Sequence, residues 1–178
     1  LSGGFGEGID PLPVEATYEQ CLDYCLEFEN VQAEPHSEMF ANMRKVDSVS
    51  VTEQTIIGVD GNEITLHIHQ PKDRTGALPG VVHIHGGGMV IMTAADPSAV
   101  LWRNTLAEQG MVVIGVEYRN GAGKLGNHPF PAGLNDCAAS LRWTHQQRSE
   151  LNLSSVTLSG ESGGGNLSIA TALKANAE

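Results

Sequence analysis

The chain has 178 residues, the size of one ordinary domain with a single hydrophobic core. Its 40% hydrophobic and 17% charged residues are typical of a globular protein and exclude a disordered or collagen-like chain. Ten basic and 21 acidic residues give a net charge of −11, which disfavours nucleic acid as a partner. No apolar run reaches the ~20 residues of a membrane helix, so we expect a soluble protein without a membrane partner.

The three cysteines, Cys21, Cys25 and Cys137, are an odd number without a CxxC pair. The sequence therefore predicts no disulfide framework and a cytoplasmic location. Residues 1–13 are rich in glycine and proline without periodicity, which predicts a flexible lead-in. From Thr17, a capping box with Gln20 and apolar residues at helical spacing predict an amphipathic helix of about three turns. Cys21 and Cys25 share its apolar face, and we expect buried thiols there rather than metal ligands.

Residues 46–59 and 62–70 alternate between apolar and polar side chains, and Asp60-Gly61 separates them. This pattern predicts an antiparallel hairpin. His67 and His69 share the polar face of its second strand. Because no third ligand stands near them, we expect a solvated strand face and no metal.

Short apolar strands and helices then alternate three times. We expect strands at residues 80–85, 111–117 and 156–159, and helices at 99–109, 131–148 and 164–176. This order indicates an α/β fold in which a mostly parallel sheet, entered through the antiparallel hairpin, has helices on both faces. Ligands of such sheets bind in the loops at the carboxyl ends of the strands.

Residues 160–164 read G-x-S-x-G directly between a predicted strand and a predicted helix. A nucleophilic serine must project from a sharp turn, and glycine neighbours allow the chain to turn that tightly. The helix N-terminus also favours negative charge beside this serine. We therefore predict Ser162 as a nucleophile; the alternative is a glycine-rich turn with a capping serine.

A second glycine-rich motif, His85-Gly86-Gly87-Gly88, directly follows the strand at 80–85. Consecutive glycines leave backbone N–H groups accessible, as an oxyanion hole requires. We predict that the N–H groups of Gly87, Gly88 and Gly163 form this hole. His85 and Gly86 support the loop, and proton transfer by His85 is the less favoured role.

Residues 121–126 also match the GxGxxG dinucleotide fingerprint. No helix is predicted directly after them, because His128-Pro129-Phe130-Pro131 intervenes, and the fingerprint needs a helix N-terminus for the pyrophosphate. We interpret the segment as a mobile loop. No nucleotide or other cofactor is predicted.

Three motifs, in this order, resemble the hormone-sensitive-lipase-like branch of the α/β-hydrolases: residues 85–88, residues 117–119 followed by 128–132, and residues 160–166. The resemblance implies that residues 46–178 are the amino-terminal half of an α/β-hydrolase domain and that residues 1–45 are a lead-in and a helical cap. It implies a serine carboxylesterase that cleaves small to medium carboxylic esters, or a macrolide lactone, through an acyl-enzyme. A non-catalytic small-molecule receptor on the same fold is the alternative.

The sequence departs from this family at several positions. Glu161 and Gly163 stand where Asp and Ala are common, and Asn120 to Asn127 form a longer loop than usual. With Met89, which we expect in the substrate pocket, this loop would reshape the entrance.

The most serious departure concerns the catalytic triad. The family's order is serine, acid, histidine, but neither His nor Asp follows Ser162. A serine without its base retains little catalysis, so we expect these residues alone to be nearly inactive. A carboxyl-terminal part, or a second chain, is expected to supply the acid and the histidine.

Overall fold

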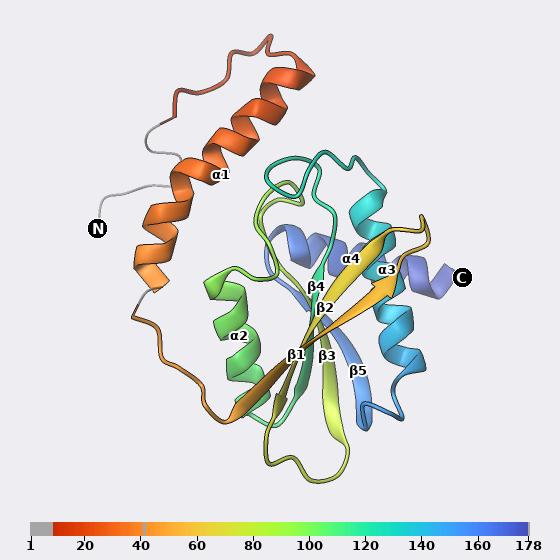
Figure 1. Cartoon of the computed structure of the whole chain (residues 1–178). Helices are drawn as coiled ribbons and strands as arrows, with labels where there is room; N and C mark the ends of the chain where they lie inside the picture. Colours follow the sequence, from red (N-terminus) through yellow and green to blue (C-terminus); the bar gives the residue numbers. More distant parts are fainter. Residues whose placement is uncertain (1–8, 41, 178) are drawn as a thin grey trace.

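The computed structural model describes residues 9–40 and 42–177 (Figure 1). Residues 1–8, most of the predicted lead-in, lie outside them. Helix α1 (Tyr18–Phe40) begins at the predicted capping box: the Thr17 N–H donates to Gln20 Oε1 over 2.8 Å, and the Gln20 N–H donates to Thr17 Oγ1 over 3.3 Å. The predicted length of about three turns is wrong, because the helix is 23 residues long and includes Pro35. The backbone N–H that a proline lacks is therefore tolerated within this helix.

Five strands form one sheet in the order β1-β2-β4-β3-β5. The predicted hairpin is confirmed: β1 and β2 are antiparallel, with Ile57 opposite Glu63. Strand β4 is antiparallel to β2 and parallel to β3, which is also parallel to β5. The strands are β1 (Val49–Ile57), β2 (Glu63–Pro71), β3 (Leu78–Ile84), β4 (Val112–Glu117) and β5 (Leu153–Gly160).

Helices cover both faces of this sheet, which confirms the predicted α/β class (Figure 1). Helix α2 (Pro97–Glu108) packs on one face, and α3 (Ala132–Gln146) and α4 (Gly163–Ala177) pack on the other. The alternation of strand residues divides the core accordingly, since Val81 and Val113 cluster with α2 whereas Val82 and Ile114 belong to the larger cluster. No helix of the described residues is long and apolar enough to span a bilayer.

The expectation of a solvated face at His67 and His69 is wrong for His69, which is buried. Helix α2 covers this part of the sheet and supplies polar partners. Arg103 Nε donates to His69 Nε2 over 2.9 Å, and His69 Nδ1 lies 2.7 Å from Asn104 Oδ1. Burial lowers the pKa of His69 to about 4, so the ring is neutral and its Nδ1–H donates to Asn104.

Asp136, a buried carboxylate of α3, joins three parts of the fold. Its Oδ2 accepts hydrogen bonds from the Arg119 backbone N–H and Nε, both over 2.9 Å. Its Oδ1 accepts one from Arg119 Nη2 over 2.9 Å and one from Asn62 Nδ2 over 3.0 Å. The hairpin turn, the end of β4 and α3 are thereby fixed relative to one another.

Replacing Asp136 with alanine should lower the free energy of unfolding by about 3 kcal/mol, because the substitution leaves the Arg119 guanidinium without its main partner. The exposed ion pair between Arg44 and Glu108 offers a matched control, and Glu108→Ala should have far less effect. Denaturant unfolding followed by circular dichroism measures both. Equal losses would contradict the role of Asp136 as a junction.

Candidate active site

Ser162 stands in a very tight turn between β5 and α4. Its φ is +52°, an uncommon backbone conformation for a residue with a side chain, and it is exposed. A methyl group on Gly164 would overlap the carbonyl oxygen of Ile84, and one on Gly160 would overlap that of Gly164. The turn therefore packs directly against the end of β3, and only glycine fits at these two positions.

The predicted oxyanion loop lies against this turn. A methyl group on Gly163 would be 2.8 Å from the backbone nitrogen of Met89 and 2.9 Å from that of Gly88. Gly87 and Gly88 have φ values of +95° and +64°, which favour glycine. The structure thus brings Ser162 and Gly163 together with residues 86–89, which precede them by more than 70 positions.

Two peptide planes of this loop are held by polar side chains. The single hydroxyl hydrogen of Tyr118 is shared between the carbonyl oxygens of His85 and Gly86, which lie 3.0 and 3.1 Å from Oη. His85 Nδ1 lies 2.9 Å from the Gly86 oxygen, an acceptor, and therefore donates to it. The His85 ring stacks on Tyr118 with centroids 4.3 Å apart. Because a peptide is planar and trans, fixing the Gly86 carbonyl also directs the Gly87 N–H to the opposite side.

Glu161 and His83 are functional candidates that the sequence analysis missed. Glu161 Oε1 accepts a hydrogen bond from the Gly86 N–H over 3.0 Å, and Oε2 lies 2.9 Å from Nε2 of the buried His83. Burial acts to raise the pKa of Glu161, but the hydrogen bonds with His83 and the Gly86 N–H outweigh it and lower the pKa. The available signal was that Glu161 stands where Asp is common in the family that the sequence resembles.

A buried polar layer continues beneath the loop. Both carboxylate oxygens of Glu117 accept the Ala94 N–H, over 3.0 and 3.1 Å, and Arg103 donates to the Ala94 carbonyl. Burial lowers the pKa of Arg103 to about 10, so the guanidinium remains charged at neutral pH. Its atoms occupy the space above Gly115, where a methyl group would lie 2.7 Å away. Ala94, in the segment that follows the predicted oxyanion loop, is thus held by Glu117 at the end of β4 and by Arg103 of α2.

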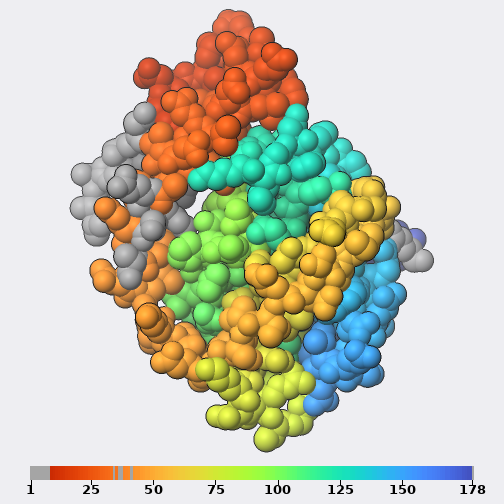
Figure 2. Space-filling model, in the orientation of Figure 1, coloured from red at the N-terminus to blue at the C-terminus, as the bar shows by residue number. Residues whose placement is uncertain are grey.

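Helix α1 contacts the two loops at this edge of the sheet. Glu29 Oε1 accepts the Met92 N–H over 2.9 Å, and Oε2 accepts the Lys124 N–H over 2.6 Å. Tyr18 Oη donates to Asn127 Oδ1 over 2.7 Å. Figure 2 shows α1 seated against the segment around residue 125. This segment contains the GxGxxG pattern, and α3 starts only at Ala132, so no helix N-terminus directly follows it.

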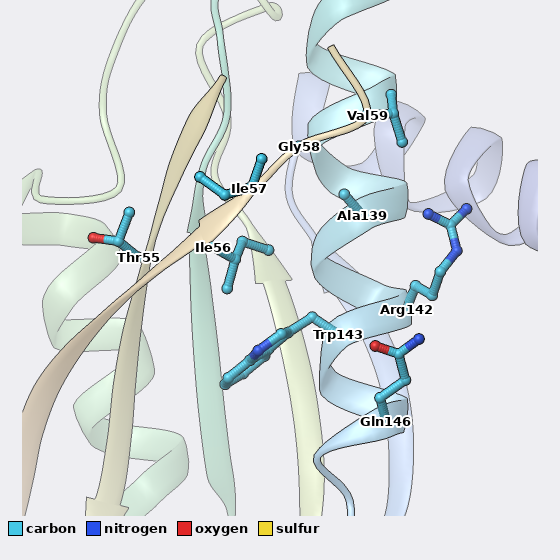
Figure 3. A pocket seen from close by; sticks show the side chains of 9 residues that line it. All are labelled: Thr55, Ile56, Ile57, Gly58, Val59, Ala139, Arg142, Trp143 and Gln146. Atoms are coloured by element: carbon cyan, nitrogen blue, oxygen red, sulfur yellow. The ribbon is translucent and has the colours of Figure 1, made fainter. Parts of the chain in front are cut away.

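Other parts of the described chain offer fewer chemical groups. No three His, Cys, Asp or Glu side chains of the described residues gather as metal ligands. An open pocket of about 380 Å³ lies between β1 and α3, lined in part by Ile56, Arg142 and Trp143 (Figure 3). None of its lining residues belongs to the loops around Ser162, so it is a separate feature.

Comparisons with known proteins bear on the fold and the family of the chain. A family model described as the alpha/beta hydrolase fold matches residues 81–178. The chain belongs to the α/β-hydrolase fold family. The resemblance to its hormone-sensitive-lipase-like branch is also confirmed. A solved structure, "brefeldin A esterase, a bacterial homologue of human hormone sensitive lipase", is 39% identical with a TM-score of 0.81 and covers 94% of this chain and 47% of its own.

Two further relatives of this α/β-hydrolase are esterases by name. Carboxylesterase NlhH of Mycobacterium tuberculosis is 33% identical over 119 residues, which are 65% of this chain and 36% of the relative. A bacterial heroin esterase is 32% identical with a TM-score of 0.75, over 85% of this chain and 47% of the other. The chain thus spans about a third of the length of the curated relatives and about half that of the solved structures.

Gly164→Ala should destabilise this α/β-hydrolase by about 3 kcal/mol or more, because the new methyl group overlaps backbone atoms that cannot move independently of β3. Gly165→Ala is the control, since a methyl group there would lie 3.2 Å from the Gly160 oxygen, a far milder contact than the 2.0 Å approach of a Gly164 methyl group to the Ile84 oxygen. Thermal unfolding of both variants measures the difference. A Gly164→Ala protein as stable as the Gly165→Ala protein would contradict the tight packing.

Proposed function

We propose that this α/β-hydrolase is part of a serine carboxylesterase with Ser162 as its nucleophile. The observation that carries the proposal is the contact of Gly163 with Gly88 and Met89, which puts the turn of an exposed serine beside a loop of accessible backbone N–H groups. The esterases among its relatives support the same reaction class. The substrate class is a small to medium carboxylic ester, and a macrolide lactone is one member of that class.

In this mechanism the Ser162 oxygen attacks the ester carbonyl as a histidine removes its proton. The N–H groups of Gly87, Gly88 and Gly163 stabilise the negative charge that develops on the carbonyl oxygen. The alcohol leaves with the proton from the histidine. Water, activated by the same histidine, then hydrolyses the acyl-enzyme. No cofactor takes part in these steps.

The histidine and the acid of the triad are proposed to come from outside these 178 residues. Two histidines close to the turn, His83 and His85, are buried and bonded to Glu161 and Gly86. In addition, β5 ends the strand order of the described sheet, and Ile169 and Leu173 of α4 are 67% and 69% exposed. An unpaired edge beside exposed apolar residues supports further strands and helices from a carboxyl-terminal half.

In the natural-length protein, Ser162→Ala should lower kcat for p-nitrophenyl acetate at least about a thousandfold. A fluorophosphonate should add one phosphonyl group to Ser162 and none to the variant, as measured by mass spectrometry. Ser154→Ala, at the other end of β5 and exposed, is the control and should retain activity. Undiminished turnover in Ser162→Ala would eliminate the mechanism. Ligand binding without turnover or labelling in the unmodified protein would favour the receptor alternative.

We further propose that residues 1–45 act as a cap over the substrate entrance beside Ser162. Glu29 is the main residue that holds α1 there. Met89 stands at the same entrance, since its carbonyl oxygen accepts the Gly121 N–H over 2.9 Å and its side chain is partly exposed. The Glu29 carboxylate thereby links α1 to the loop that contains Met92 and to the loop that contains Lys124.

Glu29→Ala should raise KM severalfold for longer acyl esters, with less effect on kcat, because the cap contributes substrate contacts rather than chemistry. Amide hydrogen exchange in residues 120–127 should accelerate in the same variant. Glu27→Ala removes an exposed carboxylate from the same helix and should change neither quantity. Unchanged exchange and KM in Glu29→Ala would exclude this role.

A further inference from the structure

Glu161 occupies an unusual position between the nucleophile turn and the oxyanion loop. It directly precedes Ser162, yet its side chain extends back toward β3, where its Cγ lies 3.6 Å from the position a methyl group would take on Gly86. Each carboxylate oxygen has a different partner, Gly86 N–H for Oε1 and His83 Nε2 for Oε2. One side chain thus connects the two segments that the proposed reaction needs in register.

The state of His83 shows why a carboxylate is required. Its Nδ1 is buried and has no hydrogen-bond partner among the described residues. A buried N–H without an acceptor is rarer and more costly than an unpaired acceptor, so the hydrogen belongs on Nε2 and is donated to Glu161. Both partners of Glu161 are therefore donors. Only a group with two acceptor oxygens satisfies both, and a glutamine would face one donor with another donor.

The consequence for the loop follows from its peptide planes. Glu161 holds the N–H side of the His85-Gly86 peptide, and Tyr118 holds its carbonyl side over 3.0 Å. The next plane, which carries the Gly87 N–H, is held at its carbonyl by His85 and Tyr118. If the first plane moves, the α-carbon of Gly86 moves with it, and the second plane, which shares this atom, is displaced from its position.

We propose that Glu161, anchored by His83, is a positioning residue that orients the oxyanion-hole N–H groups for the ester hydrolysis proposed above. It touches no reacting atom. It acts through the Gly86 backbone, and its contribution is felt in the transition state, when negative charge develops on the substrate oxygen. The inference rests on the proposed function of Ser162.

The test uses the protein at its natural length and p-nitrophenyl acetate as the substrate, with kcat expressed per site titrated by a fluorophosphonate. Glu161→Ala should lower kcat by about 10- to 100-fold while KM stays within about twofold, the signature of a lost transition-state interaction. Glu161→Gln, nearly isosteric, should lower kcat by about 3- to 10-fold, because it satisfies only one of the two donors. If Glu161 only stabilised the fold, its variants would contain more unfolded protein and fewer titrated sites. Dividing the rate by the number of titrated sites removes that effect.

The matched control is Glu53→Gln, which alters another Glu–His pair, with His67 at 3.4 Å on the neighbouring hairpin. It should leave kcat and KM unchanged. A kcat per titrated site within twofold of the unmodified protein in Glu161→Gln would overturn the inference, even if Glu161→Ala did not fold. An equal loss in Glu53→Gln would also overturn it. Persistent hydrolysis in Ser162→Ala would instead refute the proposed function, so the two failures are distinguishable.

Discussion

The turn after β5 and the end of β3 approach each other more closely than side chains would permit. Gly160 and Gly164 remove the atoms that would keep the backbones apart, and the carbonyl of Ile84 occupies the space. The positive φ of Ser162 is the local cost of this arrangement. Because β3 and β5 are hydrogen-bonded neighbours, the strained turn and the oxyanion loop are fixed relative to one another by the sheet itself.

The polar layer beneath the loop has a different energetic character. Arg103 is fully buried and charged, and desolvation of such a group is expensive unless its hydrogen bonds are satisfied. Neutral His69 and the Ala94 carbonyl accept from it, and Glu117 lies nearby and supplies a balancing charge. The network is only partly satisfied, because Arg103 Nη1 is buried without a hydrogen-bond partner among the described residues. The bonds that Arg103 does make still join α2 to β2 and to Ala94. Here that network lies below Ala94, in the segment that follows the predicted oxyanion loop.

Local patterns predicted most of the fold, and they singled out the glycine-rich turn and the glycine-rich loop that the structure brings together. The alternation in β2, the apolar runs of β3 and β4, and the glycines around Ser162 are each determined by a few neighbouring residues. The roles of His69 and Glu161 depend instead on contacts between distant segments. His69 is buried because α2 covers it, and Glu161 meets Gly86 across 75 positions of sequence. Pro35 shows that a local signal can also be overridden, since this strong helix breaker did not end α1.

The groups that support the oxyanion loop come from strands or lie directly at their ends, as His83, His85 and Tyr118 do. The groups at the entrance come from loops and from α1, as Met89 and Glu29 do. A catalytic geometry gains from rigid support, because donors that need no reorganisation stabilise charge best. Loops at the entrance can vary without disturbing that support. Such a division allows similar structures to be named for different esters, as brefeldin A esterase and heroin esterase are. The strands and their ends hold the reacting atoms in place, while the surrounding loops select the substrate.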